Sequence, residues 1–236
     1  MNNPFWNVTI TGADDHTDPR DLADLSHRFP FVEWGILFSV NDNRPRYPSR
    51  GWVERLAEIK NGPMSLRNFH LSAHFCGALA KESMTGTGWM LDCVRDWGFS
   101  RVQINGFALN KVGAMRSRKG LELILQTRDL DTIKLHQDFA LARRADGERC
   151  SLLFDASGGR GLSPERWPQA THTNGSDVPV GYAGGITPDN VLSVIRELSH
   201  VEPTWIDMES GVRTDDRLDL AKVERVLSQV AGLPPA

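Results

Sequence analysis

The chain has 236 residues, of which 40% are hydrophobic and 24% are charged, and its formal net charge is −3. This length suits one α/β barrel, and so small a charge gives no reason to expect nucleic acid or an anionic membrane as a partner. Its three scattered cysteines exclude a disulfide framework, and no secretory signal or membrane-spanning apolar run is recognisable. We therefore expect a cytoplasmic protein.

Eight predicted strands alternate with helical segments along the chain. The strands are predicted at Asn7–Gly12, Val32–Ser39, Asn68–Cys76, Arg101–Gly106, Leu121–Arg128, Ser151–Phe154, Val180–Gly185 and Trp205–Glu209. Helices are predicted to begin at Asp18-Pro19 and at Ser49, and to cover Met84–Trp97, Asn110–Arg118, Asp131–Ala145, Pro164–Trp167, Pro188–Leu198 and Asp219–Val230. The segments at Asn110–Arg118 and Pro164–Trp167 give the weakest helical signals.

This alternation predicts the fold class. Strands separated by helices pair in parallel through right-handed crossovers, and eight such units favour a single closed (β/α)8 TIM barrel. A doubly wound open sheet is the structural alternative. No linker divides the chain, so residues 1–236 are expected to form one domain, with an active site at the carboxyl ends of the strands.

The stretch Ser151–Gly161, SLLFDASGGRG, indicates a catalytic site. Asp155 would lie at the end of a buried strand, directly before a glycine-rich turn, and a second such turn follows the seventh strand. Backbone N–H groups in bare turns of this kind can approach an anion. The turn glycines are Gly158, Gly159, Gly161, Gly184 and Gly185. We expect a phosphate site beside a carboxylic acid.

The barrel interior is predicted to be unusually polar. Alternation along the strands directs one set of polar side chains inward: Thr9, Thr11, Glu33, His70, His74, Gln103, Asn105, Gln126, Asp155, Asp207 and Glu209. Barrel interiors are normally filled with branched apolar side chains, so this set must satisfy itself, bind water or surround a polar ligand. A divalent metal held by His70, His74, Asp155, Asp207 or Glu209 is an alternative, although no short metal-binding motif accompanies these residues.

Six segments in the expected order resemble the phosphoribosylanthranilate isomerase family of barrels. They are Arg44–Tyr47 (RPRY), Val102–Gly106 (VQING), Leu152–Gly161 (LLFDASGGRG), Gly181–Val191 (GYAGGITPDNV), Ile206–Val212 (IDMESGV) and Arg217–Val226 (RLDLAKVERV). The resemblance covers nearly the whole chain. It implies an Amadori rearrangement of a phosphoribosyl amine into a 1-amino-2-keto sugar phosphate, without metal or organic cofactor, in a monomer or a homodimer.

The same resemblance implies roles for individual residues. Asp155 would be the general acid that protonates the furanose ring oxygen, and Arg46 would face the anthranilate moiety. Gln103, Asn105 and Asp207 are further candidates for contact with the substrate. The implied phosphate-binding set is Gly158, Gly159, Gly161, Gly184, Gly185, Ser210 and Gly211.

One expected catalytic group is absent. The family's general base is a cysteine that ends the first strand in KICG, and this segment aligns with Thr9–Gly12, which places Thr11 at the base position. A threonine hydroxyl is a poor proton acceptor near neutral pH. His74 or Cys76 at the end of the third strand could supply the base, and Asp14, Asp15 and His16 compete for the role.

The missing base leaves three functions open. The first is the family's own isomerisation with a substituted base. The second is a different phosphosugar reaction, such as that of a metal-assisted epimerase or lyase. The third is a barrel that binds a phosphorylated ligand without catalysis.

Overall fold

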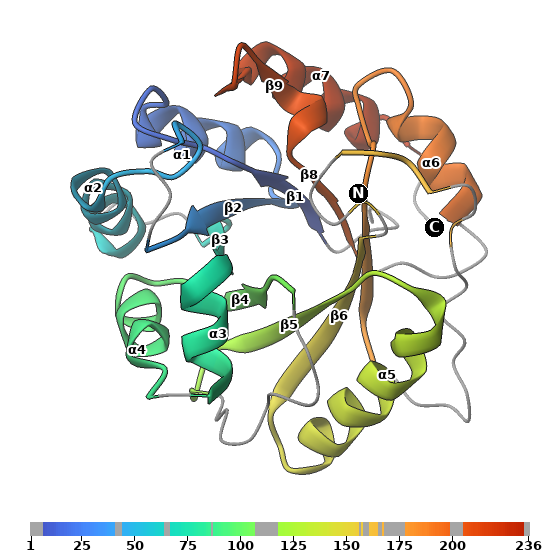
Figure 1. The fold of residues 1–236 in the computed structure, drawn as a ribbon. Helices are drawn as coiled ribbons and strands as arrows, with labels where there is room; N and C mark the ends of the chain where they lie inside the picture. Colours follow the sequence, from blue (N-terminus) through green and yellow to red (C-terminus); the bar gives the residue numbers. More distant parts are fainter. Residues whose placement is uncertain are drawn as a thin grey trace.

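The computed structural model describes residues 7–40, 44–63, 67–85, 87–106, 118–155, 157, 161–164, 167, 178–198 and 205–233. Eight parallel strands close into a barrel in the order of the sequence, with helices around the outside (Figure 1). The strands are β1 (Asn7–Thr11), β2 (Val32–Phe38), β3 (His70–Phe75), β4 (Arg101–Ile104), β5 (Glu122–Thr127), β6 (Arg149–Asp155), β7 (Val180–Ala183) and β8 (Trp205–Met208). The predicted (β/α)8 barrel is confirmed.

The helices are α1 (Pro19–Arg28), α2 (Arg50–Asn61), α3 (Gly77–Thr85), α4 (Trp89–Asp96), α5 (Leu130–Ala145), α6 (Val191–Leu198) and α7 (Leu220–Ala231). A short 3₁₀ turn, η2 (Ser210–Val212), and a hairpin of β9 (Arg213–Thr214) and β10 (Arg217–Leu218) lie between β8 and α7. Two predicted helix starts are confirmed. The Asp18 carboxylate accepts a hydrogen bond from the first turn of α1, and the Ser49 hydroxyl does the same for α2.

One predicted helix is wrong. Met84–Trp97 was expected as a single helix, whereas the chain forms α3 and α4, separated at Gly88, whose φ of +62° is left-handed. A left-handed residue cannot continue a right-handed helix, and glycine adopts that conformation readily. The prediction at Asn110–Arg118 lies outside the described residues except for Arg118, and the one at Pro164–Trp167 is described only at Pro164 and Trp167.

The main hydrophobic core lies between the strands and the helices. Outward-facing strand residues such as Ile10, Trp34, Leu71 and Phe75 are fully buried there. Because side chains alternate along a strand, the residues between them face the barrel interior. The fold therefore gains its apolar burial outside the barrel, and this leaves the interior free for polar groups.

A second, smaller apolar cluster lies inside the barrel. It consists of Ile124, Leu153, Ala183 and Trp205. The Trp205 indole fits because β7 has Gly181 beside it, where any Cβ would overlap the ring. The Arg101 guanidinium lies over the other side, 4.1 Å from the ring centroid. Trp205 therefore fills the interior, with a cation–π contact beneath it.

A charged network occupies the amino-terminal end of the interior, where β4 and β5 begin. Arg101 Nη1 donates to Glu33 Oε1 at 2.9 Å, and its Nε lies 3.6 Å from Glu122 Oε1. Thr9 Oγ1 also donates to Glu33 Oε1, and Ser151 Oγ donates to Glu122 Oε1. The sequence prediction did not include Arg101, although it has the same strand parity as Gln103. Since the pair with Glu33 is buried, each charge depends on the other.

Candidate active site

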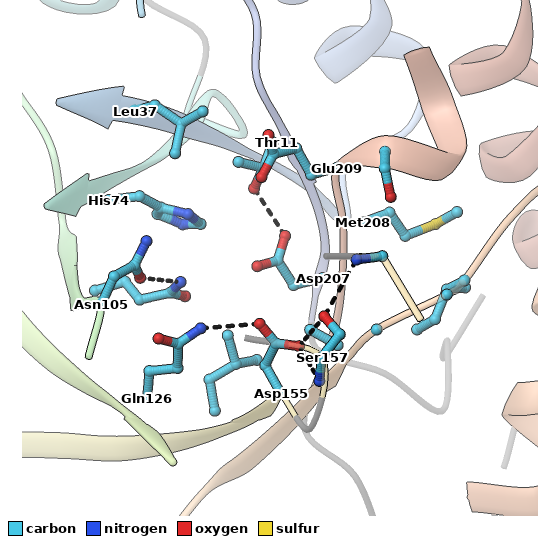
Figure 2. Close-up of a pocket in the computed structure, with 18 residues that line it drawn as sticks. Thr11, Leu37, His74, Asn105, Gln126, Asp155, Ser157, Asp207, Met208 and Glu209 are labelled. Carbon is cyan, nitrogen blue, oxygen red and sulfur yellow. Dashed lines mark hydrogen bonds between the residues drawn. The ribbon is translucent and has the colours of Figure 1, made fainter. Parts of the chain in front are cut away.

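A polar pocket opens at the carboxyl ends of the strands, where barrel enzymes have their active sites (Figure 2). Its described lining residues are Thr11, Leu37, His74, Gln103, Asn105, Gln126, Leu153, Asp155, Ser157, Gly161, Ala183, Gly184, Gly185, Ile186, Asp207, Met208, Glu209 and Ser210. Among the described lining residues, every strand except β2 and β7 contributes a polar side chain, directly or from the loop that follows it, whereas β2 contributes Leu37 and β7 contributes Ala183. The polar interior predicted from strand alternation thus leads into one concave site.

Two carboxylates lie at the same height in this pocket. Asp155 on β6 pairs in register with Ala183 on β7, and Ala183 pairs with Asp207 on β8. Since neighbouring strands are about 4.8 Å apart, the backbones of the two aspartates are separated by roughly 10 Å. The residue that pairs with both of them on the intervening strand is Ala183, whose side chain is a single methyl group. The register therefore allows the two acids to face one ligand.

Asp155 accepts several hydrogen bonds. Gln126 Nε2 donates to Oδ2 at 2.9 Å, and the backbone N–H and Oγ of Ser157 donate to Oδ1 at 3.1 and 2.7 Å. These donors fix the orientation of the carboxylate. The sequence prediction missed Ser157, although an Asp followed by Ser two residues later is typical of an Asx turn.

Asp207 lies in a less polar environment. It is buried, with a relative exposure of 7%, and its Oδ1 accepts a hydrogen bond from Thr11 Oγ1 at 2.7 Å. Burial raises its pKa to about 8; the Thr11 hydrogen bond opposes that rise, while the charges of Glu209, Asp155 and Glu33 add to it. The free protein therefore holds a proton on Asp207 at neutral pH, and Thr11 at the expected base position donates to this carboxyl group.

His74 points into the same pocket (Figure 2). Its Nε2 is buried and has no hydrogen-bond partner among the described residues. Burial, helped by the charge of Arg101, lowers its pKa to about 3, so the imidazole stays neutral. Gly35 on β2 makes room for it, because a Cβ there would overlap both the Thr11 hydroxyl and the His74 ring. A neutral imidazole suits hydrogen bonding to a ligand better than removal of a proton from carbon.

The remaining candidates at β3 and β4 form a chain of hydrogen bonds. Gln103 Nε2 donates to Asn105 Oδ1 at 2.8 Å, and Asn105 Nδ2 lies 3.1 Å from Cys76 Sγ. Gln103 and Asn105 line the pocket, whereas Cys76 does not. Burial raises the pKa of the Cys76 thiol, which leaves it largely protonated. His70 is half-buried at the start of β3, away from the pocket.

Three other candidate bases lie in the loop after β1 and do not line the pocket. Asp14 is fully buried and forms an ion pair with Arg213 at 3.3 Å. Asp15 accepts hydrogen bonds from Ser49, and His16 contacts Asp14 through Nδ1 at 3.2 Å. Their visible role is to hold the loops after β1, β2 and β8 together.

Glycines allow the loops after β6, β7 and β8 to pack closely. A Cβ at Gly161 would overlap Ser210 Oγ, and one at Gly185 would overlap the Ser163 backbone. A Cβ at Gly211 would overlap the carbonyl of Ile186. Gly161, Gly184 and Gly185 also have positive φ angles of 67°, 114° and 62°. Gly211 lies beside the pocket without lining it, and the predicted phosphate ligands Gly158 and Gly159 lie outside the described residues.

Arg46 lies beside Glu209, which lines the pocket, but Arg46 does not itself line it. Its Nη1 donates to Glu209 Oε1 at 2.6 Å and its Nη2 to Asp216 Oδ1 at 2.7 Å. Asp216 and its neighbour Asp215 form the two-residue turn of the β9–β10 hairpin, with φ angles of 55° and 49°. Burial raises the pKa of Glu209 against the opposing charge of Arg46. Two carboxylates therefore balance this one guanidinium.

The described residues offer neither a metal site nor a membrane-spanning helix. No group of three His, Cys, Asp or Glu side chains in the described part of the chain is arranged to hold a metal ion. Within the same ranges, no helix is both long and apolar enough to cross a membrane.

The closed barrel and its acidic pocket at the carboxyl ends of the strands place the chain among the (β/α)8 barrel enzymes. Comparison with known proteins defines the family. The family profile "N-(5'phosphoribosyl)anthranilate (PRA) isomerase" matches residues 90–229, more than half of the chain. The chain belongs to this family of isomerases, as its sequence segments predicted.

Curated relatives agree with this assignment. The N-(5'-phosphoribosyl)anthranilate isomerase of Zygosaccharomyces bailii is 29% identical over 151 residues, which are 52% of this chain and 72% of that enzyme. The enzyme of the same name from Synechococcus sp. (strain JA-3-3Ab) is 43% identical over 86 residues, 34% of this chain. That match spans only 36% of the cyanobacterial enzyme.

Solved structures share the fold. A phosphoribosyl anthranilate isomerase in complex with reduced 1-(o-carboxyphenylamino)-1-deoxyribulose 5-phosphate superposes with a TM-score of 0.64 and 15% identity, covering 96% of this chain and 99% of that one. The Thermus thermophilus enzyme gives a TM-score of 0.63 at 19% identity, covering 97% of this chain and 100% of that one. The Thermotoga maritima enzyme, at 0.61 and 16% identity over 96% and 99% of the two chains, is described as dimeric. Family, relatives and fold together support an isomerase function of the phosphoribosylanthranilate isomerase type.

Proposed function

We propose that the protein isomerises a phosphoribosylated aromatic amine, N-(5'-phosphoribosyl)anthranilate, to its 1-amino-2-keto sugar phosphate, as an enzyme of tryptophan biosynthesis. The observation that supports this most strongly is the pair Asp155 and Asp207, at one height in the pocket of a barrel of this family. An aldose-to-ketose rearrangement needs one group that donates a proton and one that accepts a proton. Asp155, oriented by Gln126 and Ser157, is the proposed donor to the ring oxygen.

The phosphate of the substrate is proposed to bind where the loops after β6, β7 and β8 meet. Gly161, Gly184, Gly185 and Ser210 line this side of the pocket, and glycine turns expose backbone N–H groups to an anion. Gly158, Gly159 and Gly211 complete the proposed set. The position is the one that barrels of this class commonly use for phosphate.

The amine substituent is proposed to lie toward Arg46, on the opposite side of the pocket mouth. The Arg46 guanidinium is paired with Glu209 and Asp216, so a carboxylate on the substrate would replace Glu209 at Nη1. Burial already raises the pKa of Glu209, and this lowers the free-energy cost of neutralising that side chain when the substrate displaces it. His74, Gln103 and Asn105 then offer hydrogen-bonding groups to the sugar hydroxyls between the two ends.

Replacing Asp155 by Asn tests this function. The amide keeps the shape and one acceptor but cannot donate a proton to the ring oxygen, so kcat is expected to fall by about 10²–10⁴-fold. Conversion of the phosphoribosyl amine to its ketose isomer would be followed by NMR. Asp96→Asn, at an exposed aspartate paired with Arg95 at the end of α4, is the matched control.

A growth assay addresses the physiological role. The wild-type chain should restore growth of a tryptophan auxotroph that lacks the isomerase, and Asp155→Asn should not. Failure of the wild-type chain at good expression, together with no conversion by the purified protein, would contradict the proposed function.

Replacing Ser210 by Asp tests the phosphate site. Ser210 lines the pocket and lies against Gly161, so a carboxylate there would repel a phosphate dianion. KM should rise at least about tenfold, a loss of about 1.4 kcal/mol in binding, while kcat changes less. Inorganic phosphate should also inhibit the variant less well than the wild type. Ser210→Ala is the control, and equal KM values for the Asp and Ala variants would place the phosphate elsewhere.

We further propose that the enzyme works in the cytoplasm, as a monomer or a homodimer. The related structures include a dimeric enzyme, and the described residues contain no membrane-spanning helix. Light scattering of the purified chain over a range of concentrations would distinguish the two oligomeric states.

A further inference from the structure

The family's strand-one cysteine is absent here, and the structure shows what surrounds the place it would occupy. Thr11 lies at the end of β1, and its hydroxyl proton points to Asp207 Oδ1 at 2.7 Å (Figure 2). A hydroxyl that donates to a carboxyl group is not set up to accept a proton from carbon. The acceptor in this contact is Asp207, whose side chain points into the pocket beside Thr11.

We propose that Asp207 replaces the missing cysteine as the general base of the isomerisation, with Thr11 as its positioning residue and Asp155 as the acid. This inference rests on the proposed function. Both carboxyl groups line the same pocket, both lie at the height of Ala183, and the small Ala183 side chain leaves the space between them to the substrate.

The proton transfers balance. Asp155 gives its proton to the ring oxygen as the C1′–O4′ bond breaks, and the nitrogen lone pair forms a C1′=N iminium. Asp207 takes the C2′ proton; the C–H electron pair becomes the C1′=C2′ bond and the iminium electrons return to nitrogen. The resulting enol loses its O–H proton to water and takes a proton from water at C1′, which gives the ketone. Asp207 keeps the C2′ proton and Asp155 has given its own to the ring oxygen, so the proton lies on Asp207 again, as in the free protein, and no atoms are gained or lost overall.

The alternatives in the same pocket are weaker bases. His74 faces the pocket, but burial and the Arg101 charge lower its pKa to about 3, so it has little affinity for a proton. Burial and the charges of Glu209, Asp155 and Glu33 raise the pKa of Asp207 to about 8, against the Thr11 hydrogen bond. A carboxylate in such surroundings binds a proton far more strongly than one in water, which favours removal of a proton from carbon.

Asp207 carries a proton in the free protein below about pH 8. In the free protein burial keeps it on Asp207, whereas Asp155 accepts hydrogen bonds from Gln126 and Ser157. Transfer of that proton from Asp207 to Asp155 prepares both residues at once, since it creates the base and the acid together. Asp207 gives up this proton as the pH rises through about 8.

The first test is the pH profile of kcat/KM, which reports ionisations in the free enzyme. The wild type should lose activity above about pH 8, because the pair then has no proton to give. Thr11→Val removes the hydrogen bond that lowers the pKa of Asp207, so this basic limb should move to higher pH while activity persists. A profile that stays level to pH 9.5 in the wild type, or an unmoved limb in Thr11→Val, would overturn the proposal.

The second test separates the two roles. Asp207→Asn should lower kcat at least about 100-fold, and substrate deuterated at C2′ should react more slowly still, because breaking the C–H bond becomes rate-limiting. Asp155→Asn should show no such isotope effect, since ring opening limits it. Thr11→Cys in the Asp207→Asn background should recover at least tenfold in kcat. Circular dichroism would verify folding of each variant.

The outcomes distinguish this inference from the proposed function. If the wild type is active and Asp155→Asn is not, but Asp207→Asn retains activity, Asp207 is not the base and the isomerase assignment stands. If Asp207→Asn loses activity without any isotope effect, the side chain acts by shape alone and the proposal fails. If the wild type itself does not convert the substrate, the proposed function fails first.

Discussion

Asp207→Asn is expected to raise the free energy of unfolding at pH 8 by on the order of several kcal/mol. The Asp207 carboxyl has a pKa of 3.8 in an open chain and about 8 in the fold. At pH values below the open-chain pKa of 3.8, the carboxyl group is protonated in both the folded and the unfolded state, so its ionisation does not change the free energy of unfolding. Between pH 4 and 8 the unfolded state releases the proton that the folded state keeps, so the stability contributed by this group is lost as pH rises. Asparagine, which is neutral at every pH, removes that loss.

Urea unfolding at pH 4, 6 and 8 would measure this effect. The difference between variant and wild type should be small at pH 4 and should grow with pH up to about 8. The His74 contribution, which runs in the opposite direction, is present in both proteins and cancels. Asp96→Asn is again the control, and a difference independent of pH would show that Asp207 is not buried as an acid. If Asp207→Asn is more stable but less active than the wild type, Asp207 contributes to catalysis at the expense of stability.

Arg101→Leu is expected to lower the free energy of unfolding by about 3–5 kcal/mol, because it leaves the buried Glu33 carboxylate without its cation. Glu33 Oε2 already has no partner among the described residues, so a water-excluded charge would remain after the change. The variant also loses the contact with the Trp205 ring. Guanidinium unfolding at neutral pH would measure the loss.

The double variant Arg101→Leu, Glu33→Leu provides the control. It removes both charges, so it should recover most of the stability that Arg101→Leu loses. Breaking a surface pair such as Arg95 with Asp96, where water solvates both charges, should change the free energy of unfolding far less. A loss for Arg101→Leu no larger than that of the surface pair would mean that the charged network at the base of the barrel does not stabilise the fold.

The fold could be predicted because its signals are local. Caps at Asp18 and Ser49, apolar strands and glycine-rich turns act over a few residues, and eight repeats of one unit leave few arrangements. Strand alternation also predicted the polar interior, because the face to which a side chain points follows from its position along its own strand and not from the adjacent strands. The split between α3 and α4 was missed because the helical pattern of Met84–Trp97 masks the left-handed conformation of Gly88.

The electrostatics of the site could not be predicted in the same way. That Thr11 donates to Asp207 depends on two residues 196 positions apart meeting across the seam between β1 and β8. Arg46 meets Asp216 only because the chain forms the β9–β10 hairpin after β8, with Asp216 in its turn, and the strand pattern of the sequence does not predict that hairpin. The sequence around Gly35 is that of an ordinary strand. The need for glycine there comes from Thr11 and His74 on the neighbouring strands, which leave no room for a Cβ. Such contacts depend on the register between neighbouring strands and on closure of the barrel, which local sequence patterns do not predict.

The balanced charge of Arg46 gives the pocket mouth a direction. On the side of β2 and β8 the Arg46 guanidinium is paired with Glu209 and Asp216, and Asp216 also lies 3.5 Å from Arg213 Nε. On the side of β6 and β7 the loops turn on glycines instead. A phosphate dianion therefore meets, on the first side, a guanidinium that two carboxylates already hold, and on the second side glycine turns whose backbone N–H groups can approach it. Under the proposed function, the first side would receive the amine end of the substrate and the second side its phosphate.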